Sequence, residues 1–260
     1  MKRGDKAVVF VDILGFARLT EDWPRRIIHR RKGTMRFSGT SESRNRLAFF
    51  HSILDQTVEE FSKLSNSITA MSFSDCAFVL IGNPYLTAEF AVELMQHYIR
   101  AHVPARMGIA AGTFWPARQS SDIAGRASIS RAIFHGTAIV RAHMAEGNGQ
   151  AGMRIFLHES LESVAYHLGP RPILRFDRSK NGVFGELSYL CHHDQYRDAR
   201  REPKVDADDL SLWKSAVLLR RMVDKKAPRR IHQQYLETLS ALNRMRRASG
   251  RPPFKRSQVP

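Results

Sequence analysis

Apolar and polar residues alternate along this chain with two different periods, and these periods predict its strands and helices. The run Val8–Val11 is short, apolar and β-branched, which is typical of a strand at the centre of a sheet. Residues 43–64 place apolar side chains three and four positions apart, so we expect a helix with one stripe facing a core. Two further strands, over 68–73 and 76–81, are separated by a short polar turn and predict a β-hairpin.

The rest of the chain continues this alternation of helices and strands. We expect a helix over 88–99, a strand over 105–112, a polar loop over 115–128, a helix over 136–147, a strand over 153–157, a short helix over 161–168, and strands over 173–176 and 183–190. Helices that alternate with strands around an antiparallel hairpin indicate a ferredoxin-like α+β fold, with helices flanking the central sheet.

Changes in composition suggest how the chain is divided. Residues 1–200 are predicted to form one domain, interrupted by a basic loop over 22–42 that is either a solvated insertion or a lid whose arginines meet phosphates. Residues 206–248 carry two apolar helical stripes and predict a helical extension, packed on the domain or on a partner chain. The basic tail over 249–260 is expected to be disordered.

Charge and cysteine content narrow the classes of protein. The chain has 41 Lys+Arg against 25 Asp+Glu, a net charge of +16, which points to a polyanionic partner such as nucleic acid, an acidic membrane or a phosphorylated small molecule. No run of aromatic residues typical of RNA-recognition sheets occurs, so nucleic acid is not the favoured partner. Two cysteines without metal spacing argue against zinc or a disulfide scaffold. We find no membrane-spanning run or secretory signal and expect a cytoplasmic protein.

Two acidic residues stand where the predicted strands end. Asp12 follows the first apolar strand, and Asp75 lies in the hairpin turn. A cap of a short helix and a turn residue would explain them without function. If the hairpin pairs beside the first strand, both carboxylates project from one end of the sheet and can bind divalent ions that bridge triphosphate oxygens.

Four segments in order resemble the motifs of class III nucleotidyl cyclases. Phe10–Phe16 resembles the first-strand motif FxDIxGF, and Phe73–Asp75 stands where that family has its hairpin Gly-Asp. Arg106–Gly112 is similar to the family's RxGIxxG strand, and Gly136–Ala142 to its GxxVNxA helix. The resemblance covers roughly residues 5–190, and the ordered set is more specific than any one motif.

This resemblance implies a metal-dependent reaction at a shared site. It assigns Asp12, Asp75 and the Ile13 carbonyl as ligands of two Mg²⁺ or Mn²⁺ ions, which would activate a hydroxyl and neutralise the leaving pyrophosphate. The backbone amides of Leu14, Gly15 and Phe16 are expected to face the triphosphate. It also implies a homodimer with active sites at the interface.

The departures from the family motifs concern the base and the phosphates. Met71 and Ile133 occupy the two positions at which purine cyclases carry polar base-binding residues, so the usual purine contacts are lost. Val140 and Met144 replace the family's helix Asn and Arg. Arg141 is the candidate catalytic replacement, acting on the pyrophosphate from the partner subunit, although it could equally be a solvated helix position.

Two interpretations of these departures remain open. One is a catalytically degenerate cyclase-like protein, or a ferredoxin-like protein that binds nucleic acid. The other is an active cyclase whose substrate carries a different nucleobase, and the retention of both aspartates favours this interpretation. The sequence is similar to the pyrimidine cyclases of bacterial Pycsar anti-phage systems, which implies that UTP, or less favoured CTP, is converted to cyclic UMP or cyclic CMP. A cyclic-nucleotide-gated effector would then act downstream of the product.

Overall fold

The computed structural model describes most of the predicted domain and one helix beyond it. The described residues are 5–16, 30–31, 34–35, 42–65, 68–123, 127–168, 173–176, 181–190 and 229–253. Most of the basic loop over 22–42, the first half of the predicted helical extension, and the tail beyond residue 253 lie outside the described residues.

A mixed sheet with β1 near its centre organises the described part of the chain. In spatial order its seven strands are β10 (Ile173–Arg175), β11 (Val183–Leu187), β9 (Ile155–His158), β6 (Ala105–Gly112), β1 (Lys6–Ile13), β5 (Cys76–Leu80) and β4 (Thr69–Ser72). β1 pairs antiparallel with both β5 and β6, whereas β6 and β9 run parallel. The antiparallel-containing sheet with flanking helices confirms the predicted α+β fold.

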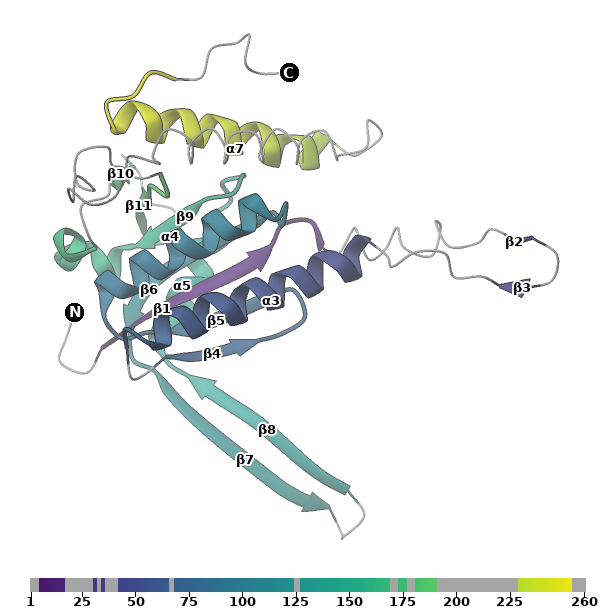
Figure 1. The fold of residues 1–260 in the computed structure, drawn as a ribbon. Helices are drawn as coiled ribbons and strands as arrows, with labels where there is room; N and C mark the ends of the chain where they lie inside the picture. The colour runs from purple at the N-terminus through teal and green to yellow at the C-terminus, as the bar shows by residue number, and fades with distance from the viewer. Residues whose placement is uncertain are drawn as a thin grey trace.

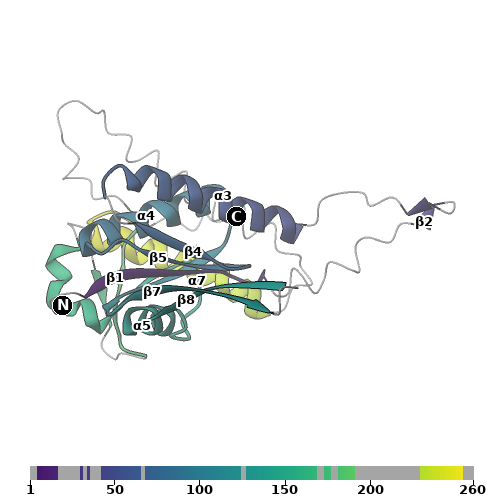
Figure 2. The same cartoon turned by 90° about the horizontal axis from the view of Figure 1, so that it is seen from below.

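Helices cover both faces of this sheet (Figures 1 and 2). The helices α3 (Glu42–Ser62) and α4 (Pro84–Arg100) lie on one face, and α5 (Thr137–Glu146) lies on the other. A 3-10 helix, η1 (Glu159–His167), follows β9. α5 lies directly on β6 because Gly108 leaves room for it: a Cβ there would collide with the carbonyl oxygen of Ala142.

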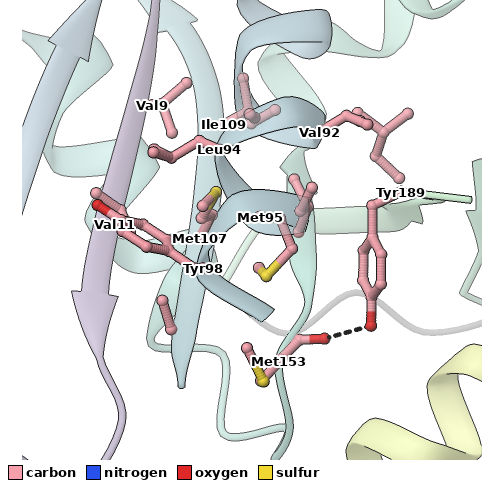
Figure 3. Close-up of a cluster of buried hydrophobic side chains, with 14 of the residues drawn as sticks. Val9, Val11, Val92, Leu94, Met95, Tyr98, Met107, Ile109, Met153 and Tyr189 are labelled. Carbon is pink, nitrogen blue, oxygen red and sulfur yellow. Dashed lines mark hydrogen bonds between the residues drawn. The ribbon is translucent and has the colours of Figure 1, made fainter. Parts of the chain in front are cut away.

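The alternating side chains of β1 separate two apolar cores. Val9 and Val11 point into the larger core, beneath α3 and α4, together with Met107 and Ile109 of β6 (Figure 3). Val8 and Phe10 point to the other face, beneath α5. Because β1 is buried on both faces, it reads in the sequence as a continuous apolar run rather than an alternating one.

The prediction of a polar loop over 115–128 is wrong. Residues there form the first strand of a long hairpin, β7 (Trp115–Ile123) and β8 (Ala127–His135), which projects away from the sheet (Figure 1). The segment lacks the apolar alternation of a half-buried strand, so its pattern resembles that of a loop, although its backbone pairs over nine residues. A second small ladder, β2 (Arg30–Arg31) with β3 (Thr34–Met35), occurs within the basic segment.

The C-terminal helix α7 (Arg229–Ala248) packs on the domain itself. Five of its apolar side chains are buried in the larger core, namely those of Tyr235, Leu239, Ala241, Leu242 and Met245. α7 therefore corresponds to the second predicted stripe and shares the core of the sheet, while the proposed boundary between the domain and its extension stays a prediction. No helix in the described part of the chain is long and apolar enough to cross a membrane.

Candidate active site

The two predicted metal ligands come together at one end of the sheet. Asp12 is the penultimate residue of β1 and pairs in register with Cys76, the residue directly after Asp75. The N–H of Ile13 donates to the carbonyl oxygen of Asp75 at 2.9 Å, which fixes the hairpin turn against the end of β1. Both side chains are half-buried, and within the described residues neither carboxylate forms a hydrogen bond or an ion pair.

The electrostatic surroundings oppose the charge on Asp12. Burial, together with the nearby carboxylates of Glu146 and Asp75, raises the pKa of Asp12 from 3.8 to about 7, although Arg106 acts in the opposite direction. Burial, with Asp12 and Asp75 as further causes, also raises the pKa of the Cys76 thiol to about 11. An excess of negative charge at a partly desolvated strand end is the condition that a bound cation relieves.

The Arg106–Glu146 pair limits how far Arg106 offsets the negative charge around Asp12. Arg106 is the register partner of Asp12 on β6. Its guanidinium donates to Glu146 at 2.6 Å and to the carbonyl oxygen of Gln150 at 2.8 Å. Glu146 was not identified from the sequence as part of the charge environment of Asp12, because its pairing with Arg106 joins residues forty positions apart.

The residues present fit a divalent metal of the magnesium type. No cluster of three or more His, Cys, Asp or Glu side chains suited to a metal occurs among the described residues. Mg²⁺ is commonly held by one or two carboxylates, with waters and substrate phosphates completing its coordination. Asp12 and Asp75, with backbone carbonyls such as that of Ile13, supply this kind of donor set.

The loop after β1 agrees in part with the predicted phosphate site. The Leu14 amide is not available to a triphosphate, because it donates to the carbonyl oxygen of Pro104 at 2.8 Å; this corrects one of the three expected amides. Gly15 is exposed and has a φ of 75°, and its amide forms no hydrogen bond within the described residues. Phe16, directly beside it, is half-buried.

The positions predicted to meet the base lie near one apolar cluster. Met71 on β4 packs against the cluster that contains Phe10 and Phe78, and Phe134 packs against the same cluster. Phe134 follows Ile133 on β8, so the backbone places Ile133 beside this cluster, although its side chain lies outside the described residues. Met71 and the backbone of Ile133 are therefore both next to apolar and aromatic side chains.

Arg141 lies far from Asp12 in the same chain. Its guanidinium donates to the carbonyl oxygen of Ala111 at 3.0 Å and lines an open polar pocket of about 510 Å³, shared with Thr137 and His158. Ala111 and Asp12 stand at opposite ends of the β1–β6 ladder, about 15–20 Å apart at 3.3 Å per residue. Arg141 and Asp12 of one chain therefore cannot act on the same phosphate group.

The two positions on α5 that depart from the resembled helix motif are exposed. Val140 is 59% exposed and Met144 is 41% exposed, one helical turn apart. His158, in the pocket of Arg141, has its pKa lowered mainly by burial, so it is neutral at physiological pH. Its Nδ1 accepts from the N–H of Ser160 at 3.0 Å, which makes it a capping residue of η1.

Comparison with solved structures identifies the fold. No protein-family model matches the sequence, and no curated protein matches it. A bacterial light-regulated adenylyl cyclase superposes with a TM-score of 0.50 at 11% identity, covering 80% of this chain and 97% of that one. The chain has the fold of a class III cyclase catalytic domain.

Two further cyclase structures are similar. A second structure of a bacterial light-regulated adenylyl cyclase gives a TM-score of 0.50 at 11% identity, over 81% of this chain and 57% of that longer one. A guanylyl cyclase domain from the fungus Blastocladiella emersonii covers 71% of this chain and 94% of its own at 14% identity, with a TM-score of 0.46. The cyclase fold places Asp12 and Asp75 side by side, as expected from the motifs.

Proposed function

We propose that this protein is a nucleotidyl cyclase that converts a nucleoside triphosphate to a 3′,5′-cyclic nucleotide and pyrophosphate. The observation that carries the proposal is the pair of carboxylates Asp12 and Asp75 at adjacent strand ends, without hydrogen-bond or ion-pair partners in the described part of the chain. A structural cap or turn does not need two unneutralised carboxylates, one of them with a pKa of about 7. The cyclase fold supports the same interpretation.

Each residue has a distinct part in this reaction. Asp12, Asp75 and the Ile13 carbonyl hold Mg²⁺ or Mn²⁺; the bound ions supply activation of the 3′-hydroxyl and neutralisation of the leaving pyrophosphate. The motif resemblance assigns the backbone amides of Gly15 and Phe16 to the triphosphate, and the Gly15 amide lies on an exposed residue. The backbone hydrogen bond from Ile13 to the Asp75 carbonyl holds the hairpin turn against the end of β1 that carries Asp12.

The substrate base is proposed to be a pyrimidine, with UTP favoured over CTP. Met71 packs in an apolar cluster with Phe78, and Phe134 packs against the same cluster beside Ile133. Apolar side chains at these positions cannot form the hydrogen bonds that distinguish a purine edge. The resemblance to Pycsar cyclases adds the proposed role, in which the cyclic nucleotide signals phage infection to a cyclic-nucleotide-gated effector in the cytoplasm.

The protein is proposed to act as a homodimer because one chain does not bring all its candidate groups together. Arg141 and Asp12 lie at opposite ends of the β1–β6 ladder, so Arg141 can meet the pyrophosphate only at the partner's metal site. Exposed apolar side chains on α5 and the β4–β5 turn, namely Val140, Met144 and Phe73, offer a surface that a second copy would cover.

Product analysis from an equimolar mixture of the four nucleoside triphosphates tests the activity and the base together. We expect Mn²⁺-dependent formation of cyclic UMP, or of cyclic CMP, in mass spectra of the products. A purine product would reject the base assignment and leave the cyclase reaction in place. Absence of every cyclic product with both Mg²⁺ and Mn²⁺ would reject catalysis.

Complementation between inactive variants tests the dimer. Each proposed site takes Asp12 from one chain and Arg141 from the other. A dimer of one Asp12→Ala chain and one Arg141→Ala chain therefore has one site with both residues intact and one site with both substituted. Random mixing makes half of the dimers mixed, and about a quarter of wild-type activity should return. If both variants are inactive and no activity returns after subunit exchange, Arg141 does not act across an interface.

A further inference from the structure

The helix α7 lies against the loop that follows β1. A crevice of only about 20 Å³ separates them, and it is lined by Leu14 and Gly15 from the loop and by Gln234, Tyr235 and Thr238 from α7. Tyr235 and Thr238 are 7% and 2% exposed, so the side of α7 that meets the loop is closely packed.

Polar side chains of α7 fix its position relative to the chain before β9. The Gln234 side-chain oxygen accepts from the N–H of Gly152 at 2.7 Å, and the Thr238 hydroxyl accepts from the N–H of Met153 at 2.9 Å. The Thr238 hydroxyl also donates to the Gln234 carbonyl at 2.8 Å, so its orientation is set. Gly152 has a φ of 100°, and a Cβ there would lie 2.9 Å from the backbone nitrogen of Thr238.

The same segment continues to the metal end of the sheet. The Met153 carbonyl accepts from the Tyr189 hydroxyl at 3.0 Å (Figure 3). The Arg154 carbonyl accepts from the N–H of Met107 at 2.9 Å, next to the residue that pairs with Asp12. Met153 also lines the crevice beneath Gly15. A displacement of α7 would therefore change the packing beneath the loop and the backbone of β6 next to Arg106, the register partner of Asp12.

We propose that α7 positions the Leu14–Phe16 loop for phosphate binding, and that Thr238 and Gln234 are the positioning residues. The role for phosphate binding rests on the proposed cyclase function. The positioning itself is a property of the folded chain, and it can be measured without turnover. In this proposal, a shift of α7 moves the Leu14–Phe16 loop through Met153 and the other residues that line the crevice, and so alters how the loop binds the substrate phosphates.

Thr238→Val in the full chain tests this proposal, because valine keeps the shape and removes the acceptor for the Met153 N–H. We expect amide hydrogen exchange at Leu14, whose N–H donates to the Pro104 carbonyl, to accelerate about fivefold, the factor that corresponds to transmitting the loss of one net hydrogen bond at Thr238 to the loop. The KM for the nucleotide should rise by a similar factor, with kcat changed less than twofold. Thr238→Ser, which restores the hydroxyl, should recover both values.

Thr57→Val is the matched control. Thr57 is fully buried on α3, and its hydroxyl donates to the Ile53 carbonyl at 2.8 Å, away from the crevice. It should reduce stability without changing loop exchange or KM. If Thr238→Val behaves like Thr57→Val in both readouts, α7 is only structural and the proposal is overturned.

Two further results separate this proposal from the proposed function. If no nucleotide is cyclised but the loop exchanges faster in Thr238→Val alone, the positioning is supported and the cyclase reaction is not. If Thr238→Val does not fold, Gln234→Met at a half-buried position replaces it, with the same expected acceleration. An unchanged loop in that variant would overturn the proposal.

Discussion

The substitution Asp12→Asn should make the metal-free protein more stable while abolishing its activity. Burial raises the pKa of Asp12 from 3.8 to about 7, so the folded protein holds this proton more tightly than the unfolded chain does. The free energy of unfolding therefore falls as pH rises from about 4 to about 7, and the full penalty is present above pH 7. Asparagine carries no charge and removes this penalty.

The magnitude follows from the size of the shift. Three pKa units correspond to about 4 kcal/mol. Because the carboxylate is only half-buried, solvent screening reduces this to about 2 kcal/mol, or a rise in Tm of roughly 4–8 °C for a domain of this size. Added Mn²⁺ should make wild type the more stable of the two proteins. At a Mn²⁺ concentration one hundred times the Kd of the site, wild type should gain about 2.7 kcal/mol and the variant nothing.

Thermal unfolding at pH 5 and pH 8, with EDTA or Mn²⁺, measures these differences. Glu60→Gln is the control, since Glu60 is exposed and no hydrogen bond of its side chain occurs within the described residues. An Asp12→Asn protein that is no more stable than wild type at pH 8 in EDTA would refute the electrostatic reasoning. Equal stabilisation of both proteins by Mn²⁺ would refute Asp12 as a ligand.

Two further predictions concern packing and a buried ion pair. Gly108→Ala should lower the free energy of unfolding by about 3 kcal/mol or more, because the added Cβ collides with the backbone of α5. Gly147→Ala has room for a Cβ and should lower it by under about 1 kcal/mol. Chemical denaturation measures both values. Arg154→Met should lower the free energy of unfolding by about 3 kcal/mol, because Glu186 is then left buried with only Arg244 at 3.7 Å. Arg175→Met, in an exposed pair, should lower it by under about 1 kcal/mol. Equal losses within either pair would contradict the burial argument.

The sequence predicted those elements whose residues are buried with a regular period. β1, the β4–β5 hairpin and α3 were found because strand and helix periods place their apolar side chains against a core. The hairpin β7–β8 was not found, because backbone pairing makes it and no apolar alternation marks it. The position of Asp75 beside the end of β1 follows from the pairing of β5 with β1, which the sequence analysis considered for the hairpin.

The surroundings of the site could not be predicted, because they depend on contacts between distant residues. Glu146 reaches Arg106 across forty positions, and this contact leaves Asp12 without an ion-pair partner among the described residues. Pro104 takes the Leu14 amide that was expected to face phosphate. The role of α7 likewise depends on bonds from Gln234 and Thr238 that have no signature in their own segment.

Metal-dependent release of pyrophosphate by wild type and by Asp75→Asn tests the central claim most directly. Asp75→Asn keeps the size of the side chain and the backbone bond from Ile13, so the fold should persist while one metal ligand is lost. We predict that wild type with Mn²⁺ releases pyrophosphate and cyclic nucleotide in equal amounts, and that Asp75→Asn loses at least about a hundredfold in rate. Turnover by a folded Asp75→Asn protein at the wild-type rate would contradict the two-carboxylate site.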